Sequence, residues 1–198
     1  MLTLDSSEQV KSGKESAGVA RQYCGRLGKV ENCQSGVFVG YVGDKGHRLL
    51  DARLYLPQKW FEDNSAERRE KTGIPKDLTF ESKPQIAGLM IRNLDRSGLF
   101  PAKWIGCDAT FGMDREFLEG LPQGRFYFAS IRTNLHVLTS APEWEVPKRT
   151  GSRGKVPSRL RLTETPVTVA DLAKTLPFTP MILKEGAKGP IGAFLHAC

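Results

Sequence analysis

The sequence predicts an α/β fold built on one mixed sheet, in which three antiparallel strands precede parallel strands that follow helical crossovers. Two of the observations behind this prediction are β-type alternation and a capped amphipathic helix. The third is that two later apolar segments, typical of strands, flank a short helical segment. These segments occupy residues 36–42, 47–56, 82–97, 102–108 and 125–132. Because a helical crossover brings the next strand back parallel to its neighbour, the order indicates a mixed sheet.

The first three predicted strands are short segments joined by turns. Residues 2–5 form an apolar run that ends on Asp5, and residues 36–42 place Val37 and Val39 on one face. A GDKG turn then leads into the return strand at residues 47–56. Alternation in that return strand predicts one dry face, formed by Leu50, Ala52, Leu54 and Leu56.

A polar connection and the principal helix follow these strands. Residues 57–82 predict a surface connection with a short helix near residues 66–71. Ser82 and Gln85 then form a capping-box pattern, and Gly98 is placed to end the helix that they begin. Apolar residues recur inside it at helical spacing, namely Ile86, Leu89, Met90 and Leu94. A second, shorter helix is predicted at residues 115–121, between the two later strands.

Asp5 and Asp108 each end a predicted strand, and the order of the elements would bring them together. The two strands are expected to be parallel neighbours, and open α/β sheets bind ligands at the carboxyl ends of such strands. Two facing carboxylates with open water positions suit Mg²⁺ or Mn²⁺. Such ions assist displacement at a phosphodiester. The pattern alone leaves open the plainer interpretation that both are ordinary strand-end acids in contact with water.

Several long strings of the sequence resemble transposases of bacterial insertion sequences, in the DDE superfamily. They lie at residues 12–42, 53–60, 71–75, 80–85, 104–112 and 184–191, and they include RLYLPQKW and WIGCDATFG. This resemblance implies a ribonuclease-H-like catalytic core that cleaves and joins DNA at transposon ends with Mg²⁺, for which Mn²⁺ substitutes. It implies further that Asp5 and Asp108 are the first two catalytic acids and ligands of the metal.

The sequence departs from the family pattern at three places. Four residues precede Asp5, where the family carries a DNA-binding region, and Ser6 stands where a second acid is common. After residue 132 no segment resembles the helix that carries the family's catalytic Glu. The glutamates of that region lie among Pro and Gly, and none is nominated as the third acid: Glu143, Glu145, Glu164 and Glu185. We therefore expect a fragment that is truncated at both ends and inactive by itself.

Two regions are expected: residues 1–132 as the incomplete catalytic core, and residues 133–198 as part of a β-rich insertion subdomain. The second includes a basic loop, residues 148–161, whose cations have no acid between them: Lys148, Arg149, Arg153, Lys155, Arg159 and Arg161. That charge density favours contacts with DNA phosphates over a merely solvated loop. Trp144 is a candidate for stacking on an unpaired base, although burial is the commoner role of tryptophan. A short helix is predicted at residues 168–176.

Composition and charge limit the classes of partner. The 198 residues carry 29 Lys and Arg against 22 Asp and Glu, a net charge of +7, which favours a polyanion such as double-stranded DNA. No apolar stretch approaches the roughly 20 residues of a membrane helix. The four cysteines form no CxxC pair and predict neither a zinc site nor a disulfide framework. A cytoplasmic, nucleoid-associated bacterial protein is expected.

Two other classes of protein remain open. One is a different ribonuclease-H-like nuclease, which needs a complete set of acids within the chain. The other is a non-catalytic DNA-binding protein, for example an inhibitor that binds transposon ends or dimerises with full-length transposase. Metal-dependent nicking of DNA separates the enzymes from this last class.

Overall fold

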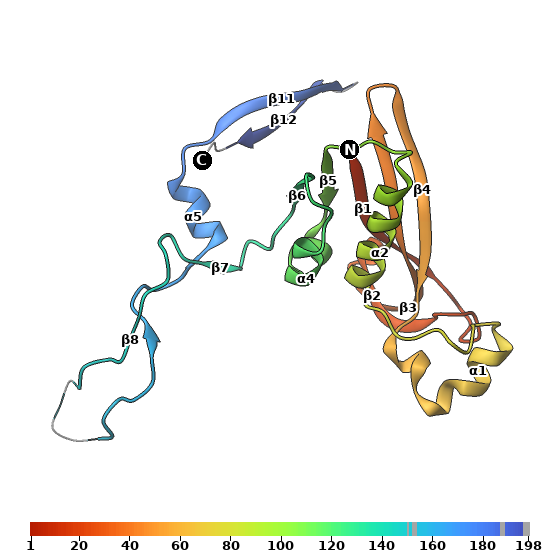
Figure 1. Ribbon diagram of the computed structural model, residues 1–198, viewed down its shortest axis with the longest axis horizontal. Helices are drawn as coiled ribbons and strands as arrows, with labels where there is room; N and C mark the ends of the chain where they lie inside the picture. The colour runs from red at the N-terminus through yellow and green to blue at the C-terminus, as the bar shows by residue number, and fades with distance from the viewer. Residues whose placement is uncertain (150, 152–153, 187–188, 196–198) are drawn as a thin grey trace. The chain divides into compact units, whose positions relative to one another are not determined.

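The computed structural model describes residues 1–149, 151, 154–186 and 189–195, and the chain divides into two compact units. The first unit is Met1–Ile131 and the second is Arg132–Cys198. Figure 1 shows them in ribbon form, coloured from red at the N-terminus to blue at the C-terminus. The first unit contains the mixed sheet, and the second contains short antiparallel strand pairs.

The first unit is built on a six-stranded sheet. Its strands are β1 (Leu2–Val10), β2 (Ala20–Cys24), β3 (Lys29–Gly43), β4 (Gly46–Tyr55), β5 (Trp104–Cys107) and β6 (Phe126–Ala129). They lie in the order β2-β3-β1-β5-β6, with β4 paired to β3 as well. Strand β3 is antiparallel to β1, β2 and β4, whereas β5 is parallel to both β1 and β6. The predicted mixed α/β arrangement is confirmed, and it is compatible with a ribonuclease-H-like domain.

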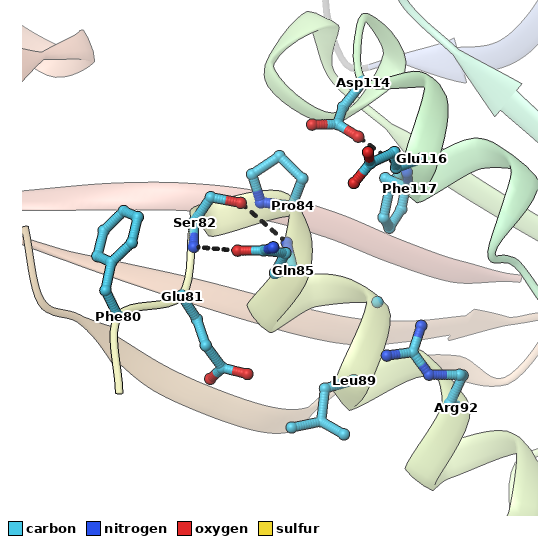
Figure 2. Close-up of a pocket in the computed structure, with 11 residues that line it drawn as sticks. Phe80, Glu81, Ser82, Pro84, Gln85, Leu89, Arg92, Asp114, Glu116 and Phe117 are labelled. Atoms are coloured by element: carbon cyan, nitrogen blue, oxygen red, sulfur yellow. Dashed lines mark hydrogen bonds between the residues drawn. The ribbon is translucent and has the colours of Figure 1, made fainter. Parts of the chain in front are cut away.

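The principal helix of this unit, α2 (Lys83–Ser97), begins and ends where the sequence predicts. The Gln85 N–H donates to the Ser82 hydroxyl at 3.4 Å, and the Ser82 N–H donates to the Gln85 side chain at 2.8 Å (Figure 2). Gly98 ends the helix with a φ of 65°, a left-handed conformation that favours glycine. Shorter helices are α1 (Ala66–Lys71), α3 (Ala109–Gly112) and α4 (Arg115–Glu119). Single 3-10 turns are η1 (Gly25–Leu27), η2 (Gln58–Phe61) and η3 (Asp63–Ser65).

The main core lies between α2 and one face of the sheet. Its large members come from the helix and the central strands: Leu2, Leu4, Val37, Val39, Ile86, Met90, Ile91 and Ile105. Burial of each such side chain contributes roughly 1.5–3 kcal/mol, so this contact holds β1 and β5 side by side under the helix. A separate cluster of Leu56, Trp60 and Ile74 orders the connection before α2, where Trp60 Nε1 donates to the Val19 carbonyl at 3.0 Å.

Two strands differ from the sequence prediction. Strand β1 was expected to end at Asp5 but continues to Val10, and β2 was not predicted at all. Residues 6–10 and 20–24 are mostly polar, so they lack the apolar alternation typical of strands. They become strands because β3, at 15 residues, is long enough to pair with β1 along one edge and with β2 and β4 along the other.

The predicted dry face of β4 is only partly correct, since Leu50 packs against the main core and Leu56 is buried, whereas Ala52 and Leu54 are exposed. A bulge at Leu50 shifts the register with β3, since Val39 lies opposite Asp51 whereas Gly40 lies opposite Leu49. Beyond the bulge the odd-numbered residues face α2, and Tyr55 packs against the main core. Ala52 and Leu54 therefore turn to the other face, where Leu54 is 44% exposed.

The remaining predicted elements occur, most of them with shorter bounds. The strands expected at residues 102–108 and 125–132 are β5 and β6, and the helix expected at residues 115–121 is α4. The short helix expected near residues 66–71 is α1. Helix α3 was not predicted, and Asp108 is its N-terminal cap.

In its described residues, the second unit contains three antiparallel strand pairs and one helix. The pairs are β7 (His136–Val137) with β10 (Val167–Thr168), β8 (Trp144–Glu145) with β9 (Arg161–Leu162), and β11 (Thr179–Gly186) with β12 (Gly189–Leu195). Helix α5 (Val169–Thr175) matches the prediction for residues 168–176, and the Thr168 hydroxyl accepts from the Asp171 N–H at 3.1 Å. Within the described residues no helix has the length and apolar character needed to cross a membrane.

Candidate active site

A cavity of about 590 Å³ lies where β1 passes the end of β5. It is lined from three directions: by β1 itself, by the hairpin of β2 and β3, and by the starts of α2 and α3. The charged side chains on its walls are Asp5, Glu8, Arg26, Lys83 and Asp108. Both acids singled out from the sequence therefore line one cavity.

Strand pairing explains how Asp5 and Asp108 meet. Leu4 and Cys107 form the last pair between β1 and β5, so the two acids follow at neighbouring positions. Leu4 and Cys107 are buried on the face covered by α2, and alternation turns the next residue of each chain to the opposite face. Asp5 is not at the end of its strand, as the sequence suggested, because β1 continues along β3. It lies instead at the point where β5 leaves the sheet.

Each of the two carboxylates is oriented by a neighbour in the chain. Asp108 caps α3, accepting from the Thr110 N–H at 3.0 Å on one oxygen and from the Thr110 hydroxyl at 3.1 Å on the other. Asp5 accepts from the Ser6 N–H at 2.7 Å on one oxygen. Asp108 is half-buried and Asp5 is exposed. Both are accessible to a ligand that enters the cavity.

Cys107 lies directly before Asp108 but does not belong to the donor set. Burial, together with the charge of Asp108, raises the pKa of its thiol to about 11. The side chain of Cys107 does not line the cavity. Its role is to pack in the core.

A buried ion pair between Glu8 and Lys83 lines the same cavity, and it was not predicted from the sequence. The Lys83 ammonium donates to Glu8 Oε1 at 3.1 Å, and the two side chains are 18% and 7% exposed. Glu8 also accepts from the Ser35 hydroxyl at 3.0 Å and from the Gly25 N–H at 3.1 Å. Burial alone would raise the pKa of Glu8, but Lys83, Gly25 and Ser35 together lower it below the ordinary value of 4.5. Glu8 is therefore ionised at neutral pH.

The sequence carried a weak signal for this pair. Glu8 continues the even-numbered phase of Leu2 and Leu4, which places it on the buried face if the strand is extended to Val10. A buried carboxylate needs a partner, and Lys83 is the cation at the start of α2. The signal was lost because the strand was expected to end at Asp5.

The cavity contains two carboxylates that are not already committed to an ion pair. Glu8 is held by Lys83, which leaves Asp5 and Asp108. Throughout the described residues no group of three or more His, Cys, Asp or Glu side chains is placed to hold a metal ion. The arrangement is a pair of carboxylates in a cavity that a ligand could enter.

The cations predicted to bind DNA lie in the second unit. Lys148, Lys155 and Arg159 are exposed in the segment between β8 and β9, as is Arg149. Arg161 was expected in that loop, but it lies in β9, directly opposite Glu145. Arg153 lies outside the described residues.

Trp144 and the glutamates of the second unit have distinct environments. Trp144 lies in β8 opposite Leu162 and is 59% exposed, so its indole is not a core residue. Glu164 accepts from the Thr139 hydroxyl at 2.6 Å and from the Ser140 hydroxyl at 2.7 Å, which lowers its pKa. Glu164 therefore holds the loop that contains Thr139 and Ser140 in place.

A second cavity, of about 360 Å³, lies between the starts of α2 and α4 and is drawn in Figure 2. Its walls carry Glu81, Arg92, Asp114 and Glu116. Asp114 caps α4 through the Phe117 N–H at 2.8 Å. Because neither Asp5 nor Asp108 reaches it, this cavity is separate from the candidate site.

Comparison with known protein families finds a match over most of the chain. No curated protein and no solved structure matches the chain. The family model described as "DDE superfamily endonuclease" matches residues 1–190, which includes both Asp5 and Asp108. Over nearly its whole length, then, this chain belongs to the DDE superfamily endonuclease family.

Proposed function

We propose that this chain belongs to a transposase that cleaves and joins DNA strands at the ends of an insertion sequence, and that Asp5 and Asp108 hold its divalent ion. The observation that carries the proposal is the meeting of these two carboxylates in one cavity, from neighbouring parallel strands of a DDE superfamily member. Residues 1–132 are the catalytic core in this proposal, and residues 133–198 are part of an insertion subdomain. The site of action is the bacterial nucleoid.

The residues of the cavity fit Mg²⁺, with Mn²⁺ as a substitute. Its lining includes carboxylates, hydroxyls and amides but no histidine or cysteine, a donor set typical of hard cations rather than zinc. Protein sites for Mg²⁺ use one or two carboxylates and complete the shell with water and substrate phosphate. When bound, the ion would activate the attacking oxygen and stabilise the leaving one.

The chain's own residues orient the site. Thr110 holds both oxygens of Asp108, so the carboxylate keeps one orientation as DNA enters. The main core holds β1 against β5, which fixes the spacing between the two acids. In the second unit, the cations between Lys148 and Arg161 contact DNA phosphates, and exposed Trp144 stacks on an unpaired base at a transposon end.

The two-carboxylate donor set also supports the proposal that this chain alone does not cleave DNA. A two-metal displacement needs ligands for both ions; Glu8, the third acid of the cavity, is paired with Lys83, and within the described residues no group of three acids is placed to hold a metal ion. The same observation favours a second candidate function, a non-catalytic protein that binds DNA or dimerises with full-length transposase and inhibits it. A complete ribonuclease-H-like nuclease of another kind is disfavoured for the same reason.

Metal binding tests the proposed site. We expect weak Mn²⁺ binding that Asp5→Asn and Asp108→Asn each abolish, measured by calorimetry and by paramagnetic broadening of NMR signals. Asp114→Asn is the matched control, because Asp114 also caps a short helix but lies outside the cavity. If Asp108→Asn leaves the affinity and the broadened signals unchanged, the assignment of the site is wrong.

A further inference from the structure

Arg26 is an unpaired cation on the wall of the cavity that contains Asp5 and Asp108. It lies in η1, at the tip of the hairpin formed by β2 and β3, and it is exposed. Within the described chain no hydrogen bond or ion pair involves its guanidinium. Lys83, the other cation of the cavity, is neutralised by Glu8 at 3.1 Å. The positive charge available to a ligand at this site is therefore that of Arg26.

The tip that carries Arg26 is held in place rather than free to swing. Gly28 closes the turn with a φ of 65°, and its N–H donates to the Cys24 carbonyl at 2.9 Å. The N–H of Gly25, the residue before Arg26, donates to Glu8 Oε2 at 3.1 Å. Because Glu8 lies three positions after Asp5 on β1, this contact ties the hairpin tip to the strand that carries the first acid.

A cation at this position favours the binding of a phosphate. An anion that approaches two carboxylates is repelled, and a guanidinium is well suited to offset this repulsion because it can donate two parallel hydrogen bonds to a phosphate. Tyr23, on the same hairpin, lines the same cavity and is 62% exposed. An exposed aromatic ring beside a free arginine is typical of surfaces that bind nucleic acid, where the ring meets a base and the cation a phosphate.

We propose that the tip of the β2–β3 hairpin is a DNA-contacting surface, in which Arg26 binds a backbone phosphate beside the Asp5–Asp108 site. This rests on the proposed function and extends it, because it identifies a DNA contact within the first unit. The buried Glu8–Lys83 pair positions the surface through Gly25. Arg26 is then the residue that sets the DNA backbone next to the two acids.

The test compares two single-charge changes on one hairpin. Arg26→Gln removes the unpaired charge, and Lys29→Gln removes a charge that is paired with Glu31 at 3.2 Å and does not line the cavity. The whole chain is titrated with a duplex oligonucleotide at several salt concentrations. We expect Arg26→Gln to weaken binding roughly fivefold and to lower the slope of log affinity against log salt by about one unit. Lys29→Gln should leave both nearly unchanged.

Equal effects of the two substitutions, or no effect of either on a chain that binds DNA, would overturn the inference. A further arm adds inorganic phosphate at constant ionic strength. Displacement of DNA from the wild type but not from Arg26→Gln would show that DNA and phosphate compete for Arg26 and would support the inference. The proposed function is judged separately, by whether Asp108→Asn abolishes Mn²⁺ binding, so the two failures are distinguishable.

Discussion

At the scale of single residues, the charged groups around the cavity fall into three kinds. Asp5 and Asp108 are accessible acids, Glu8 and Lys83 neutralise each other below the surface, and Arg26 is an accessible cation. Only the first kind was found from the sequence. An acid after an apolar run is a local signal, whereas the partner of a buried charge is set by contacts across 75 positions of the chain.

The Glu8–Lys83 pair gives a prediction about stability. Glu8→Gln should lower the free energy of unfolding by about 3 kcal/mol at pH 7, because it leaves the ammonium of Lys83 largely buried without its counter-ion. Urea unfolding measures the loss. The matched control is Glu31→Gln, which breaks a solvent-exposed pair with Lys29 and should change stability little.

The same pair predicts how the loss depends on pH. The folded chain lowers the pKa of Glu8, so the contribution of this group is present above the ordinary value of 4.5 and is lost as pH falls through the lowered folded value. The difference between wild type and Glu8→Gln should therefore shrink below pH 4.5. If the difference in the free energy of unfolding stays constant down to the lowest pH at which the chain is folded, the Glu8 carboxylate is not its cause.

At the scale of elements, some helices and strands are set by local sequence signals and others by pairing with distant strands. The bounds of α2 depend on Ser82, Gln85 and Gly98, all within one turn of its ends, so they could be read from the sequence. The facing of β4 depends on a bulge that arises only when it pairs with β3. The segment between β8 and β9 was singled out for its positive charge, and its contact with DNA stays a prediction.

That segment should carry part of the salt dependence of DNA binding. We expect log affinity to fall against log salt with a slope of about −4 to −5, for some five phosphates engaged. Replacing Lys148, Arg149, Arg153 and Lys155 by Gln should flatten the slope by about three units. Four lysines of the first unit that do not line the cavity serve as the matched set: Lys14, Lys45, Lys59 and Lys76. If both sets of substitutions flatten the slope equally, the segment is a solvated loop and not a DNA contact.

At the scale of the whole molecule, the first unit covers only one face of its sheet with α2. On the opposite face Leu54, Trp104 and Phe128 are 44%, 46% and 67% exposed, and the Trp104 ring lies 5.0 Å from that of Phe126. Asp5 and Asp108 point from this same face by strand alternation. The accessible acids and the exposed apolar residues therefore share one side of the sheet.

The completeness of the active site is testable on the whole chain. We expect no nicking of supercoiled DNA above background, even with Mn²⁺ and excess DNA, because two carboxylates do not supply ligands for both ions of a two-metal displacement. The comparison is with Asp5→Ala in the same assay. Metal-dependent nicking that this substitution abolishes would show a complete site and refute the proposal of inactivity.

The sequence by itself determined the mixed α/β class, the ends of α2 and the meeting of Asp5 and Asp108, whereas the catalytic role of these acids stays a prediction. Each rests on a local pattern: alternation, a cap within one turn, or an acid after an apolar run. The tertiary structure alone decided that β1 extends to Val10, that β2 exists, and that Glu8 meets Lys83 and Gly25. The reason is physical: polar segments become strands, and charges become buried, only when a distant partner supplies the hydrogen bonds that water would otherwise provide.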